Sequence, residues 1–129
     1  MPLPAELATC TRATLVYDLA TIDATMATVA AAARAHDLRV LFAAKSFPHP
    51  RVLELAAQHL DGFDVSSPGE LAAMPAARMI SICDPSGRAV ATAPAARTIA
   101  SIETPAQLAA AAPSAELAIR ISASITGRD

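Results

Sequence analysis

Short apolar runs alternate with amphipathic stretches along most of the chain. Residues 40–44 form an uninterrupted apolar run, which is typical of a strand buried on both faces in a parallel sheet covered by helices. Similar short runs predict further strands that begin near residues 63, 79, 98 and 117. A shorter segment of strand type, residues 14–17, precedes all of these, and we expect it to be a lead-in strand.

The stretches between these strands carry signals for helices. Thr21 is a candidate cap for the first helix, and Pro50 occupies the position typical of the first turn of the second. Residues 67–70 and 104–107 each have a Ser or Thr, a proline and then a Glu or Gln three residues after the hydroxyl, the pattern of a capping box. Helices are therefore predicted between successive strands.

Five strands separated by four helices give a βα repeat of roughly twenty residues, which indicates a parallel α/β fold. The even spacing, with no glycine-rich turn after the first strand, favours a TIM barrel over an open doubly wound sheet. A whole barrel needs about 250 residues, so we expect a partial (β/α)₈ barrel, about its first half. Residues 1–18 would be an amino-terminal segment with the lead-in strand, and residues 19–129 the partial barrel.

Alternation along the predicted strands divides their residues between two faces. Phe63 and Val65 would face the helices, which leaves Asp64 on the inner face. The same rule places further chemically active side chains on that face and near the strand ends: Lys45, Ser81, Cys83 and Arg120. Two cations and a carboxylate around one opening suit an anionic ligand, because an arginine within an apolar strand needs an anion or hydrogen-bond acceptors.

The composition of the chain argues against several classes of partner. The chain has 129 residues, of which 53% are hydrophobic and 17% charged, as expected for one globular domain. A net charge of −2 and 3% aromatic residues argue against a nucleic-acid partner. We find no signal peptide or membrane-spanning run and expect a cytoplasmic protein with no membrane partner. Cys10 and Cys83 lack metal-ligand spacing, so two free thiols and no metal are expected.

Lys45 is the main candidate for a reactive group. Ligand-binding and catalytic residues of parallel α/β folds gather at the carboxyl ends of strands, so an amine at this place is a candidate nucleophile. A lysine that extends from a strand end into water is the structural alternative. The residues around Lys45 do not by themselves decide between the two.

Two segments resemble a known family. Ala43-Ala44-Lys45-Ser46, followed by residues 62–71 with the order Gly-Phe-Asp-Val-Ser-Ser-Pro-Gly-Glu-Leu, is similar to the pyridoxal-phosphate-dependent decarboxylases of the alanine-racemase fold (fold type III), the ornithine, lysine, arginine and diaminopimelate decarboxylases. The resemblance covers residues 14–121 and only the amino-terminal half of the family's barrel. It implies pyridoxal 5'-phosphate as cofactor, Lys45 as the Schiff-base residue, Asp64 and Arg120 as its neighbours, an amino-acid substrate and a homodimer.

The chain also departs from the family pattern. Phe47 stands where an asparagine or small polar residue is usual, and residues 83–88 replace an Asn-Pro-x-Lys turn, with Arg88 as a possible substitute for its lysine. His49 and Glu70 are better explained by helix starts than by catalysis. The family's glycine-rich phosphate loop and carboxy-terminal β domain have no counterpart, so we expect little or no turnover from this chain alone. An amino-acid racemase fragment, or a non-enzymatic remnant or assembly module, are the alternatives.

Overall fold

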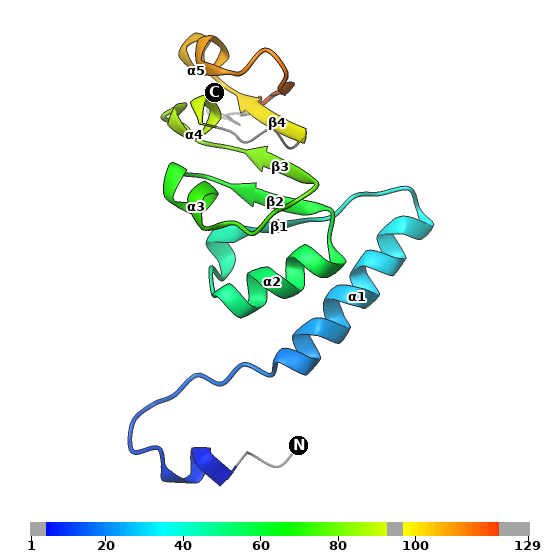
Figure 1. Ribbon diagram of the computed structural model, residues 1–129, viewed down its shortest axis with the longest axis vertical. Helices are drawn as coiled ribbons and strands as arrows, with labels where there is room; N and C mark the ends of the chain where they lie inside the picture. The colour runs from blue at the N-terminus through cyan, green and yellow to red at the C-terminus, as the bar shows by residue number, and fades with distance from the viewer. Residues whose placement is uncertain (1–4, 93–96, 122–129) are drawn as a thin grey trace, which may run out of the picture.

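The computed structural model describes residues 5–92 and 97–121, and its centre is a five-stranded, all-parallel sheet. The strands are β1 (Leu41–Ala43), β2 (Gly62–Val65), β3 (Met79–Ile82), β4 (Arg97–Ile102) and β5 (Glu116–Ile119). Their order across the sheet is the same as their order along the chain (Figure 1). The predicted α/β class and parallel pairing are confirmed, and the predicted strand positions are correct to within about three residues.

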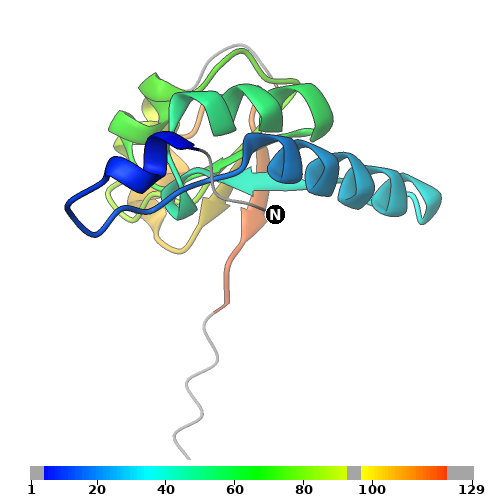
Figure 2. The ribbon, with the colours of Figure 1, turned by 90° about the horizontal axis from the view of Figure 1, so that it is seen from below.

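Helices connect the strands. They are α1 (Leu19–Ala35), α2 (Pro50–His59), α3 (Pro68–Ala73), α4 (Arg88–Ala91) and α5 (Pro105–Ala110), and two 3₁₀ turns are present, η1 (Ala5–Thr9) and η2 (Ala44–Ser46). Parallel strands that follow one another in this order, joined by right-handed crossovers, place their helices on one face of the sheet. Figure 2 shows α2 and α3 together above the sheet, with α1 alongside α2.

The hydrophobic core lies between these helices and one face of the sheet. Phe63 and Val65 of β2 are fully buried, and Ile80 and Ile82 of β3 face the same way. The helices contribute further buried residues to the same cluster: Met26, Val52, Leu53, Ala56, Ala89 and Val90. The predicted alternation is therefore confirmed for β2 and β3, because their residues expected to face the helices are buried. In the last strand Leu117, Ile119 and Ile121 were expected to face the helices in the same way, but they are exposed.

Local signals account for where the helices begin. Pro50, Pro68 and Pro105 each open a helix, where a missing amide hydrogen costs nothing. The Thr104–Gln107 capping box forms as predicted. In the other predicted box, Ser67 caps α3 but Glu70 accepts from the amide of Ser66 rather than from that of Ser67, at 2.7 Å.

The first helix begins earlier than predicted. Its N-cap is Asp18, whose carboxylate accepts from the amides of Ala20 and Thr21. The Thr21 hydroxyl donates to the same carboxylate at 2.9 Å, so it supports the cap instead of forming it. Hydrogen bonds from Thr21 lower the pKa of Asp18, because they favour the charged carboxylate.

The predicted lead-in strand at residues 14–17 is not formed within the part of the chain that is described. These residues have no regular secondary structure and no backbone hydrogen bond to another described segment, and Leu15 is 83% exposed. A strand needs a neighbour to satisfy its backbone groups, and no described strand lies beside this one. None of the helices in residues 5–92 and 97–121 has the length and apolar character needed to cross a membrane.

Candidate functional site

The candidate site lies on the face of the sheet opposite the core, near the carboxyl ends of the strands. Register places Ala43, Asp64, Ser81 and Ile99 in one row across β1 to β4. Side chains in one row of a parallel sheet share a face, so this row alternates with the buried one. Asp64 and Ser81 contact each other, since the Ser81 hydroxyl donates to the Asp64 carboxylate at 2.7 Å.

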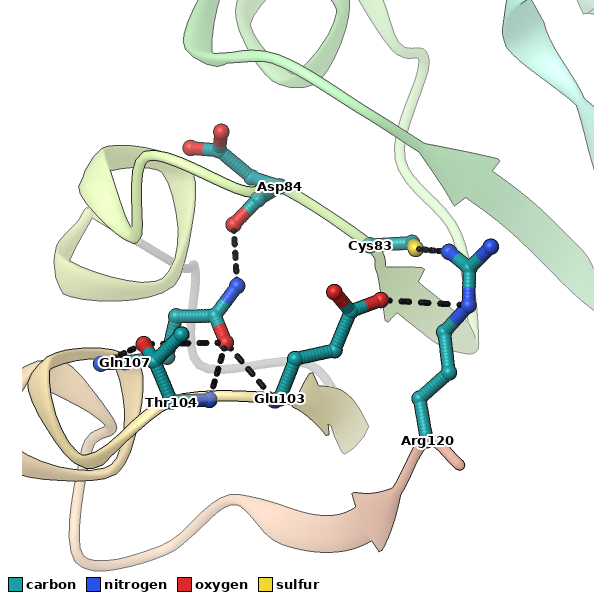
Figure 3. Close-up of polar contacts among 6 residues, drawn as sticks. All are labelled: Cys83, Asp84, Glu103, Thr104, Gln107 and Arg120. Carbon is teal, nitrogen blue, oxygen red and sulfur yellow. Dashed lines mark hydrogen bonds and ion pairs between the residues drawn. The ribbon is translucent and has the colours of Figure 1, made fainter. Parts of the chain in front are cut away.

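Arg120 links the ends of three strands. Its backbone amide donates to the carbonyl of Ile102 at 3.0 Å, which holds the residue beside β4. Its Nε lies 3.1 Å from a carboxylate oxygen of Glu103, and its Nη1 donates to the Cys83 sulfur at 2.9 Å (Figure 3). Cys83, Glu103 and Arg120 form what we call the arginine cluster, at the ends of β3, β4 and β5.

Glu103 is a member of this cluster that the sequence interpretation missed. It directly follows β4, two positions after Ser101, so alternation puts it on the inner face with Arg120. Strand alternation could have identified Glu103. The residue lies between the predicted strand and the predicted helix cap at Thr104, however, and was assigned to neither. Its carboxylate offsets the guanidinium charge, so Arg120 is less available to an anionic ligand than the sequence suggested.

Hydrogen bonds around the buried Asp84 support the backbone next to the arginine cluster. The Asp84 carboxylate accepts from the Ser86 amide at 2.9 Å and from the Ala89 amide at 2.8 Å. Gln107, also buried, donates from its side-chain amide to the Asp84 carbonyl at 2.9 Å (Figure 3). These contacts fasten the turn after β3 to the start of α5 and so fix the backbone that carries Cys83 and Glu103.

Lys45 occupies the 3₁₀ turn η2, immediately beyond β1, and is exposed. Within the described residues its side chain makes no hydrogen bond or ion pair, while the neighbouring Ser46 hydroxyl donates to the Ala43 carbonyl at 2.6 Å. It is the only lysine in the sequence. The predicted strand end is thus a tight turn, which presents the amine to solvent.

An aromatic stack lies next to this turn. Phe47 stacks on Tyr17 with ring centroids 4.3 Å apart, and on its other neighbour, His49, at 5.7 Å. The Nδ1 atom of His49 accepts from the Arg51 amide at 3.3 Å, which caps α2 and confirms a structural role at the helix start. A cavity of about 220 Å³ adjoins the stack.

The predicted site residues fall into two contacting groups and one separate residue. Arg120 contacts Cys83, and Asp64 contacts Ser81, whereas no described hydrogen bond or ion pair joins Lys45 to Asp64 or Arg120. β1 and β5 lie at opposite edges of the sheet, and four strand steps would span about 19 Å if the sheet were flat. That Lys45 and Arg120 line one shared opening therefore remains a prediction.

Comparison of the chain with models of protein families, with curated proteins and with solved structures finds no match in any of the three. The resemblance to the decarboxylases therefore depends on the two sequence segments alone.

Proposed function

We propose that this chain forms the amino-terminal part of a pyridoxal-phosphate-dependent amino-acid decarboxylase, with Lys45 bonded to the cofactor through a Schiff base. The observation that carries the proposal is the position of Lys45, directly after the first strand of an all-parallel sheet whose strands follow chain order. That order is the one found in the first half of a (β/α)₈ barrel, and barrel enzymes place their reactive groups at this end of the strands.

The residues present suit one part of the cofactor. An exposed amine at Lys45 can bond to an aldehyde, and Asp64 and Arg120 could lie beside a ring. Arg120 is not free to bind the phosphate, because its guanidinium already contacts Glu103 and Cys83. We infer that the phosphate site belongs to strands beyond β5, and we expect the isolated chain to have little or no turnover.

The chain's own residues have distinct parts in this proposal. When bound, pyridoxal phosphate supplies a ring that takes up the electron pair released as an amino acid loses carbon dioxide. Lys45 holds the cofactor covalently. Ser81 orients the Asp64 carboxylate through their 2.7 Å hydrogen bond, and Glu103 orients Arg120.

Reductive trapping tests the proposal. The folded chain is mixed with pyridoxal phosphate, reduced with borohydride and mapped by mass spectrometry. Since Lys45 is the only lysine, the amino terminus is the one other amine that can react. We expect a saturable adduct at Lys45 at cofactor concentrations that leave the amino terminus unlabelled.

A relocated lysine provides the matched control. The double variant Lys45→Arg with Arg51→Lys keeps the charge but moves the amine to α2, where the Arg51 side chain is 68% exposed. We expect at least tenfold weaker labelling at the relocated lysine. Equal labelling of the two proteins would contradict a cofactor site at Lys45, because the reaction would then report only an accessible amine.

A further inference from the structure

The turn that carries Lys45 is fixed on both sides of that residue. Ala44, just before it, is fully buried in the core, and the Ser46 hydroxyl, just after it, donates to a backbone carbonyl of β1 at 2.6 Å. Phe47 then ends η2 and packs against the core. No described backbone hydrogen bond joins residues 46–48 to another segment, so the side chain of Phe47 holds this end of the turn.

Phe47 belongs to a stack that joins three segments of the chain. The centroid of its ring lies 4.3 Å from that of Tyr17 and 5.7 Å from that of His49, with interplanar angles of 29° and 19°. These separations are close to those of favourable aromatic pairs. Tyr17 directly precedes the Asp18 cap of α1, and His49 caps α2. The stack therefore connects the beginnings of two helices to the turn of Lys45.

We propose that Tyr17 is a positioning residue for Lys45: through Phe47 it holds the turn in the geometry in which the amine reacts with the cofactor. This inference rests on the proposed function. An amine that must meet an aldehyde held in a site gains from a fixed approach, whereas its reaction with a freely diffusing aldehyde depends on exposure alone. Tyr17 is 50% exposed and comes from outside the turn, so its ring can be removed without opening the core.

Labelling by two aldehydes tests the proposal. Pyridoxal phosphate reports a site at Lys45, and propanal, which is too small to need one, reports the exposure of the amine. In both reactions the Lys45 nitrogen bonds to the aldehyde carbon with loss of water. Borohydride then reduces the carbon–nitrogen double bond by adding hydride to carbon, while water protonates nitrogen. Mass spectrometry measures each adduct at Lys45, the only lysine in the sequence.

Removal of the tyrosine ring should separate the two labels. We expect Tyr17→Ala to lower labelling of Lys45 by pyridoxal phosphate about threefold to tenfold, which corresponds to the loss of one aromatic contact, and to leave propanal labelling unchanged. Tyr17→Phe keeps the ring and should restore labelling by pyridoxal phosphate. Val16→Ala, at the adjacent residue, which is 53% exposed, is the matched control and should be labelled like the unmodified chain.

The stack itself can be followed in solution. Tyr17 is the only tyrosine and the chain has no tryptophan, so near-ultraviolet circular dichroism in the tyrosine range comes from this ring. We expect this signal to weaken in Phe47→Leu, which keeps an apolar side chain but loses both aromatic contacts, while the far-ultraviolet spectrum shows a retained fold. Labelling of Lys45 by pyridoxal phosphate should fall in this variant at least as far as in Tyr17→Ala.

The outcomes separate this inference from the proposed function. Absence of selective pyridoxal phosphate labelling at Lys45 in the unmodified chain would overturn the proposed function and, with it, this inference. Selective labelling that is equally strong in Tyr17→Ala would overturn the positioning role alone. Equal losses of both labels would also overturn it, because Tyr17 would then affect only the exposure of the amine. An unchanged tyrosine signal in Phe47→Leu would exclude the stack in solution.

Discussion

At the scale of single residues, Asp84 is the most constrained carboxylate described. Burial raises its pKa, but hydrogen bonds from the Ala89 amide and from Ser86, together with the nearby Arg88 charge, outweigh burial and hold the pKa of Asp84 below its ordinary value. The unfolded chain therefore binds this proton at a higher pH than the native chain does. Asp84 stabilises the fold above about pH 4.

We predict that the free energy of unfolding falls as the pH drops below about 4, and that Asp84→Asn removes part of this dependence. The variant should also lose about 1–3 kcal/mol at neutral pH, because the Ser86 and Ala89 amides donate to different carboxylate oxygens and an asparagine keeps only one of these acceptors. Urea unfolding at several pH values measures both effects. Asp37→Asn makes the same substitution at an exposed aspartate and is the matched control.

Gly62 lies where there is no room for a side chain. A Cβ atom at this position would lie 1.8 Å from the carbonyl oxygen of Met79 in the neighbouring strand. We predict that Gly62→Ala destabilises the chain by at least about 2 kcal/mol, because the backbones of β2 and β3 must separate. Gly69→Ala is the matched control, since a Cβ atom there would lie 4.0 Å from the hydroxyl oxygen of Ser67, an ordinary contact distance. It should be neutral or stabilising by about 0.5–1 kcal/mol. Equal melting temperatures for the two variants would contradict the close approach.

At the scale of elements, Gln107 joins α5 to the turn after β3. Its side-chain oxygen accepts from the backbone amides of Glu103 and Thr104. Its side-chain NH₂ group donates to the backbone carbonyl of Asp84. Gln107→Glu keeps the acceptor but loses the donor. We therefore predict a loss of about 1–3 kcal/mol from the unpaired buried Asp84 carbonyl and the added buried charge.

Thermal unfolding of two variants separates these contributions. Thr104→Ala removes only the cap hydroxyl and should cost about 1 kcal/mol. Gln107→Glu should cost more than Thr104→Ala at neutral pH. A smaller loss from Gln107→Glu would show that its bond to Asp84 contributes little to stability.

Sequence patterns predicted the elements that depend on local chemistry. Pro50 and the Thr104–Gln107 box lie where helices begin, because caps involve only neighbouring residues. The lead-in strand predicted for residues 14–17 is not formed, because these residues have strand propensity but no partner among the described residues. Pairing depends on distant parts of the chain, which propensity does not report.

The candidate site was predictable in part for the same reason. Alternation put Asp64, Ser81, Cys83 and Arg120 on one face, because side-chain direction in a strand is a local property. The contacts between Asp64 and Ser81 and between Arg120 and Cys83 agree with this placement, although the pairs themselves were not predicted. The Glu103 partner of Arg120 was not foreseen. The distance from Lys45 to these groups depends on the curvature of the whole sheet, which no short segment determines.

At the scale of the molecule, stability should decrease from the centre of the sheet toward β5. β2 and β3 are mostly buried, whereas all four residues of β5 are exposed. We predict that amides of residues 117–119 exchange hydrogen at least tenfold faster than those of residues 63–65 and 80–82 in a dilute sample. Hydrogen exchange followed by mass spectrometry measures this. Uniform protection across the sheet would contradict a weakly held last strand.

The strands lie side by side in the sheet in the order in which they are synthesised, and this affects folding during translation. Among the described residues, each of β2 to β5 pairs with the strand made just before it, so the sheet can extend by one strand each time another βα unit leaves the ribosome. None of these five strands has to wait for a partner that is translated much later, and each addition closes only a short loop. The nascent chain can therefore gain order from its amino-terminal side while translation is still in progress.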